Sequence, residues 1–157
     1  PILVKPFVST GRFYYQPTRS LRWEYERPVA SCLMMHEGTV KRYLKEKGQW
    51  REDASAALPA MQTVLEEIVQ WQQGSFDANP HFRAELVEGA EPRVIFVPKE
   101  ASWKKMIRQI ELAPSRDQAG VIRSVRMVED DKSFTLLEFA KVRLNRSLPA
   151  SLFVNVE

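Results

Sequence analysis

The sequence predicts an α+β protein in which one amphipathic helix lies against a curved antiparallel sheet. Two observations carry this prediction. Strand-sized apolar runs recur along most of the 157 residues, and one segment near the middle changes to a helical period. The composition, 44% hydrophobic and 27% charged, is that of a globular protein large enough to enclose a core. We therefore expect a single domain over residues 1–157.

The first third of the chain is predicted to be an antiparallel meander. Turn residues at 16–18, 27–28 and 37–38 separate strand-sized runs. In the run 21–26, apolar and charged side chains alternate, so one face is buried and the other is wet. The run 32–35 is apolar at every position, and we expect a second cover over the sheet there. The buried face would carry Leu21, Trp23 and Tyr25, and the wet face Arg22, Glu24 and Glu26.

The predicted helix covers residues 58–73. Pro59 suits its first turn, where a missing N–H costs nothing, and Gly74 is placed to end it. Its apolar stripe has the spacing of one helix face. The stripe consists of Met61, Val64, Leu65, Ile68 and Trp71.

After the helix the chain returns to extended runs, for a total of about nine or ten strands. A short helical turn is expected at 101–106. The later strands are predicted at 82–88, 93–98, 107–113, 120–129, 134–144 and 152–156.

Charge and apolar run length exclude two classes of protein. The chain has 23 Lys and Arg against 20 Asp and Glu, spread without a basic stripe, so no nucleic-acid partner is expected. The longest apolar runs, such as 94–97, are too short to span a bilayer, and no membrane-spanning segment is expected.

The sequence offers little chemistry for catalysis or metal binding. His36 and His81 lack partners at metal-ligand spacing, and Cys32 is best explained as a small buried strand residue. No G-x-S-x-G elbow or glycine-rich phosphate loop occurs. We therefore expect no catalytic residues, no metal, no cofactor and no enzymatic activity.

The remaining feature is an excess of aromatic residues and methionines. These side chains could pack into a closed core. Alternatively, one curved sheet and one helix do not collapse fully onto each other, and the gap holds an apolar ligand. Met34, Met35 and Met61 would give such a gap a compliant wall.

Short motifs along nearly the whole chain resemble those of a known family. The segment 11–17 reads GRFYYQP, 21–24 reads LRWE, and Pro28 and the Glu37–Gly38 pair follow in order. This succession resembles the periplasmic lipoprotein carriers of the LolA family. Later matches are the segment 97–99, Phe139, Asn145 and Phe153.

The resemblance implies an incomplete, half-open antiparallel β-barrel closed by a helical lid, a LolA/LolB-like fold. It also implies a monomeric carrier in the periplasm, with its signal peptide removed, which shields the acyl chains of lipoproteins and delivers them towards the outer membrane. An inner-membrane exporter and an outer-membrane acceptor would be its partners. We expect no counterpart in residues 1–157 of the helix and strand with which this family opens.

By position, the resemblance also implies a lipid-binding cavity. Gln16 would contact the lid, at a position where classical members have arginine. Leu21 replaces a large aromatic residue of the classical carrier. Both departures leave open a specialised paralogue with a glycolipid or aryl-polyene lipid as cargo, and a structural adaptor remains a further alternative. The cavity residues would be Phe13, Leu21, Trp23, Tyr25, Met34 and Phe96 from the sheet, and Met61, Leu65 and Ile68 from the lid.

Overall fold

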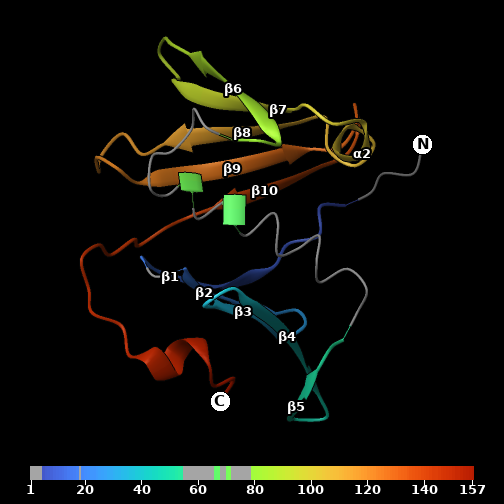
Figure 1. The fold of residues 1–157 in the computed structure, drawn as a ribbon, viewed down its shortest axis with the longest axis vertical. Coiled ribbons are helices and arrows are strands. Elements are labelled where there is room, and N and C mark those ends of the chain that lie inside the picture. Colours follow the sequence, from blue (N-terminus) through green and yellow to red (C-terminus); the bar gives the residue numbers. More distant parts are fainter. Residues whose placement is uncertain (1–4, 18, 55–65, 68–69, 72–78) are drawn as a thin grey trace. The chain divides into compact units, whose positions relative to one another are not determined.

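The computed structural model describes residues 5–17, 19–54, 66–67, 70–71 and 79–157. The chain divides into two compact units. The first unit consists of Pro1–Val69 and Arg146–Glu157, and the second of Gln70–Asn145. Each unit contains one five-stranded antiparallel sheet (Figure 1). The expectation of one domain over residues 1–157 stays a prediction.

The sheet of the first unit is a meander in which each strand pairs with the next, as predicted. The turn between the third and fourth strands contains Glu37 and Gly38, with φ angles of 49° and 81°. Two consecutive positive φ angles are typical of the tight turns that join antiparallel strands. The strands are β1 (Thr10–Gln16), β2 (Ser20–Arg27), β3 (Ser31–His36), β4 (Thr39–Glu46) and β5 (Gln49–Glu52).

Gly11 allows β1 to approach β2 closely. The register between these strands shifts at Thr10 and Gly11. A Cβ atom on residue 11 would lie 1.8 Å from the carbonyl oxygen of Glu24, a distance that no side chain tolerates. Glycine is therefore the only residue that fits this position without a movement of the backbone.

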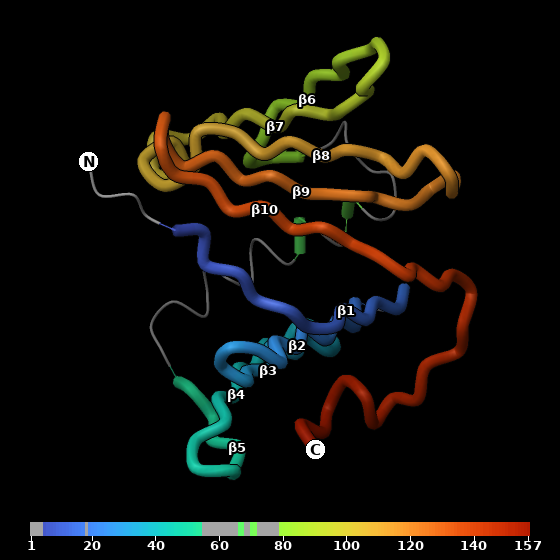
Figure 2. The backbone as a smooth tube through the Cα atoms, turned by 180° about the vertical axis from the view of Figure 1, so that it is seen from behind, coloured from blue at the N-terminus to red at the C-terminus, as the bar shows by residue number. Residues whose placement is uncertain are grey.

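The sheet of the second unit is also a meander, and Figure 2 shows its consecutive strands running side by side. A short helix, α2 (Ala101–Lys104), lies between the second and third strands and confirms the predicted helical turn. The strands are β6 (Phe82–Val87), β7 (Arg93–Pro98), β8 (Gln109–Pro114), β9 (Ile122–Val128) and β10 (Phe134–Glu138).

One face of this second sheet is apolar. The register aligns Phe96 with Ile110, and Leu112 with Val125, and all four side chains are buried. The opposite face carries charged residues. Trp71 packs on the apolar face, with its ring stacked 4.5 Å from that of Phe96.

Only part of the predicted helix lies within the described residues. Glu66, Glu67, Gln70 and Trp71 are helical, as expected. The other stripe residues, Met61, Val64, Leu65 and Ile68, lie outside the described residues. No helix in the described part of the chain is long and apolar enough to cross a membrane.

Three sequence-based expectations need correction. Where we expected one curved sheet, the described strands form two, because β5 and β6 are each the edge strand of their own sheet and do not pair with each other. The half-open barrel and its lid stay predictions. The expected strand at 152–156 is instead a 3-10 helix, η1 (Ala150–Phe153), which begins after Pro149. The strand expected at 134–144 ends at Glu138.

Candidate functional site

One face of the first sheet is continuous and apolar. The register places Tyr15, Leu21 and Met35 in one row across β1, β2 and β3. A second row contains Phe13 and Trp23. Leu21 and Met35 are almost fully buried, whereas the aromatic side chains are only partly covered. We call this surface the apolar face. It consists of Phe13, Tyr15, Leu21, Trp23, Leu33, Met35 and Val40.

Aromatic rings extend the apolar face to a polar end. The rings of Phe13 and Trp23 meet edge to face with centroids 5.7 Å apart, and Tyr25 stacks on Trp23 at 5.8 Å. Burial raises the pKa of the Tyr25 phenol, while the positive charge of Arg42 opposes this shift. Arg42 in turn pairs with Asp53 at 3.1 Å. The face is therefore apolar along its length and charged at one end.

The opposite side of the same sheet, the reverse face, is covered by the C-terminal segment. Arg22 is buried there, and its guanidinium donates to the carbonyl oxygens of Leu152 at 2.8 Å and Val156 at 3.1 Å. It also donates to the carbonyl oxygen of Asn155 and pairs with Glu24. These carbonyl groups bind a side chain instead of a neighbouring strand, which explains why this segment is not the strand we expected.

The C-terminal segment also makes an aromatic contact on the reverse face. Phe153 is buried and its ring stacks parallel to that of His36 at 6.4 Å. His36 Nδ1 lies 2.7 Å from Ser20 Oγ. The predicted second cover over residues 32–35 is therefore confirmed, with the residues 152–156 as that cover.

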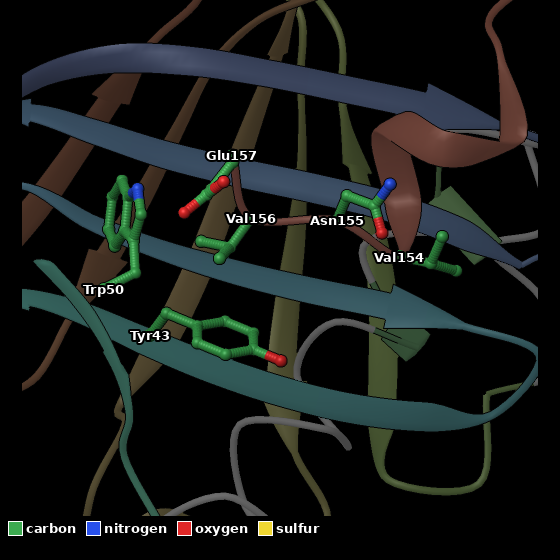
Figure 3. Close-up of a pocket in the computed structure, with 6 residues that line it drawn as sticks. All are labelled: Tyr43, Trp50, Val154, Asn155, Val156 and Glu157. Atoms are coloured by element: carbon green, nitrogen blue, oxygen red, sulfur yellow. The ribbon is translucent and has the colours of Figure 1, made fainter.

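A pocket of about 410 Å³ opens between the C-terminal segment and the β4–β5 hairpin (Figure 3). The rings of Tyr43 and Trp50 line it from the sheet, and residues 154–157 line it from the other side. Lys45 Nζ lies 5.3 Å from the centre of the Trp50 ring. Because Lys45 and Trp50 pair on the reverse face, this pocket is separate from the apolar face.

Cys32 also lies on the reverse face and is fully buried, as predicted from its position in an apolar strand. Burial raises the pKa of its thiol to about 11, so the thiol is protonated at neutral pH and a poor nucleophile. Among the described residues, no group of His, Cys, Asp and Glu side chains could hold a metal ion.

The structure brings together some of the predicted cavity residues. Phe13, Leu21 and Trp23 share the apolar face, and Tyr25 continues it. Met34 is a correction. It pairs with Arg22, so strand alternation directs it to the reverse face, where its sulfur lies 3.6 Å from that guanidinium.

The other predicted residues are elsewhere. Phe96 belongs to the second unit, where it is buried beneath Trp71. Gln16 pairs with Ser20, and alternation places it on the reverse face. Its Oε1 is buried without a hydrogen-bond partner among the described residues. Met61, Leu65 and Ile68 lie outside the described residues.

Sequence reasoning left out three members of the apolar face, Tyr15, Leu33 and Val40, and it named Met35 only together with Met34 as a compliant wall. Tyr15 stands two residues after Phe13, so alternation alone could have found it. Leu33, Met35 and Val40 required the register of β3, because a run that is apolar at every position does not reveal which residues share a face.

The sequence also matches the model of a known protein family. Residues 5–155 match the model of the family described as outer membrane lipoprotein carrier protein LolA. The chain belongs to the LolA family. A search of curated proteins gave no match. The LolA family consists of carrier proteins, so membership supports a general role in carrying lipoproteins or lipids.

Proposed function

We propose that this protein shields the acyl chains of lipoproteins, or of a related lipid, and carries them through the periplasm towards the outer membrane. An inner-membrane exporter would load it and an outer-membrane acceptor would unload it. The observation that supports the proposal is the apolar face, where partly covered rings of Phe13, Tyr15 and Trp23 adjoin buried Leu21 and Met35. Acyl chains would lie against these side chains.

The energetics of acyl transfer define what such a carrier must do. Burial of each CH₂ group contributes about 0.8 kcal/mol, so a 16-carbon chain contributes roughly 12 kcal/mol. Release of the chain into water is therefore negligible. Transfer occurs only when the acceptor offers an apolar surface of its own while the carrier opens.

The opening element in this proposal is the helix at residues 58–73. Met61, Leu65 and Ile68 would close over the chains, held by apolar contact more than by an ionic latch. The arginine that would form such a latch in classical members is replaced by the neutral Gln16, and alternation directs Gln16 to the reverse face, away from the proposed lid. Leu65→Arg or Ile68→Glu is expected to abolish binding of a fluorescent fatty acid while the circular dichroism of the sheets is retained. Unchanged binding by either variant would refute the lid.

A matched pair of tryptophan variants tests the carrier role itself. Trp23 and Trp50 are both partly covered and belong to the same sheet, but Trp23 is on the apolar face and Trp50 on the reverse face. Trp23→Ala should weaken binding of a fluorescent fatty acid about tenfold, since a large apolar contact is lost. Trp50→Ala should leave it unchanged. Equal losses in both variants, or absence of binding in the unaltered protein, would contradict the proposal.

A second candidate is a specialised carrier with a glycolipid or aryl-polyene lipid as cargo. It is favoured by the two departures from the classical pattern, Gln16 and Leu21. Mass spectrometry of organic extracts from the purified protein distinguishes the two cargoes. Triacylated peptides would support lipoprotein transport, and a peptide-free lipid would support the specialised carrier. An extract free of lipid would favour a structural adaptor.

A further inference from the structure

The indole N–H of Trp71 is a buried polar group that no described residue accepts a hydrogen bond from. Its side chain is 3% exposed, and its indole Nε1 has no hydrogen-bond partner among the described residues. An indole N–H can only donate, and a buried donor without an acceptor typically costs about 1–3 kcal/mol. Native proteins pair nearly all such groups, so an unused one needs an explanation.

The described aromatic rings around Trp71 do not supply the missing acceptor. Its ring stacks on Phe96 at 4.5 Å and meets Phe82 nearly edge-on at 6.3 Å. Phe82 in turn contacts Trp103 at 5.8 Å. A water molecule is a poor substitute, since a buried water needs about two to four polar partners and these phenyl rings offer none.

An acyl chain brings an acceptor with it. The carbonyl oxygen at the head of an ester is neutral, so it enters an aromatic environment at far lower cost than a carboxylate does. Trp71 packs on the buried side of the second sheet, where its ring stacks on Phe96, and Phe96 pairs with the buried Ile110. We propose that the Trp71 indole N–H donates a hydrogen bond to the neutral acyl carbonyl of the cargo, and so favours acyl esters over plain hydrocarbons. This inference rests on the proposed carrier function.

The test compares two probes of similar length, methyl palmitate and octadecane, in competition with a fluorescent fatty acid. The quantity measured is the ratio of their dissociation constants, since hydrophobic contributions to it cancel between variants. Trp71→Phe keeps an aromatic ring and removes the donor. It should shift the ratio against the ester by about three- to tenfold, the worth of one neutral hydrogen bond. Trp103→Phe, in the same aromatic cluster, should leave the ratio unchanged.

A direct measurement on the unaltered protein keeps the inference testable if Trp71→Phe does not fold. The indole ¹H–¹⁵N resonance of Trp71, assigned through its contact with the Phe96 ring, should move downfield when methyl palmitate binds and stay in place with octadecane. An unmoved resonance or an unshifted ratio, with both probes bound, overturns the inference and leaves the carrier function intact. If neither probe binds, both the function and the inference are overturned.

Discussion

The two sheets have the same topology but differ in how many of their faces are covered. Both contain a short run that is apolar at every position, 32–35 in β3 and 94–97 in β7. In β3 all four side chains of the run are buried. In β7 only Phe96 is buried, and Val94, Ile95 and Val97 are partly exposed.

The difference shows that an apolar run does not by itself bury both faces of a strand. β3 has a cover because the guanidinium of Arg22 binds the carbonyl groups of the C-terminal segment. The second sheet keeps a wet face, where Arg126 pairs with Glu111 and Phe134 is 55% exposed. In the first sheet, the cover over the reverse face therefore depends on the hydrogen bonds of Arg22 as well as on apolar contact.

The largest expected effect comes from the covered face of the second sheet. Phe96→Ala removes a fully buried ring that contacts Trp71, so it should lower the free energy of unfolding by about 4 kcal/mol. Phe134→Ala changes the same residue type on the wet face and should cost less than about 1 kcal/mol. Chemical denaturation of both variants measures the difference. Similar losses would mean that the two faces are not distinct.

Arg22→Met should have the next largest effect. It removes the donor of three carbonyl groups and leaves Glu24 without its partner, which should cost about 3 kcal/mol. Arg12→Met, in the exposed pair with Glu26, should have little effect on chemical denaturation. Proteolysis should cut the C-terminal segment faster in the Arg22 variant alone. Equal cleavage rates would show that this anchor does not hold the cover.

The smallest expected effect is a dependence on pH through Cys32. Burial raises its pKa from 9.0 to about 11, so between these values the unfolded chain loses a proton that the folded protein keeps. The free energy of unfolding should therefore fall as pH rises from 9 to 11, by at most about 2 kcal/mol. Cys32→Ala should lose this contribution. An identical pH dependence in both proteins would show that the covered face admits water.

Much of the fold was predictable from local patterns. Alternation at Leu21, Trp23 and Tyr25 predicted the buried face of β2. The turn residues Glu37 and Gly38 predicted the connection between β3 and β4. The same alternation placed three of the expected cavity residues on one face. These features depend on neighbouring residues only, and so the sequence alone reveals them.

Features that depend on distant residues were not predictable in this way. Met34 and Met35 are adjacent and equally apolar, and only the pairing with β2 decides which one joins Leu21. Leu152, in the 3-10 helix at Ala150–Phe153, accepts a hydrogen bond from Arg22, more than a hundred residues earlier in the chain. The apolar pattern of residues 152–156 is typical of a strand. The neighbouring sequence does not reveal that Arg22 binds carbonyl groups of this segment.

Gly11, the first residue of the motif at 11–17, has a structural role in the packing of β1 against β2. A residue that belongs to a shared motif is often retained for binding, but at this position any methyl group would collide with the main chain of Glu24. The glycine is thus a requirement of assembly, whatever cargo a relative carries. Its presence in a related sequence indicates that the first two strands meet in the same way, whereas cargo preference has to be read from the aromatic positions that follow it.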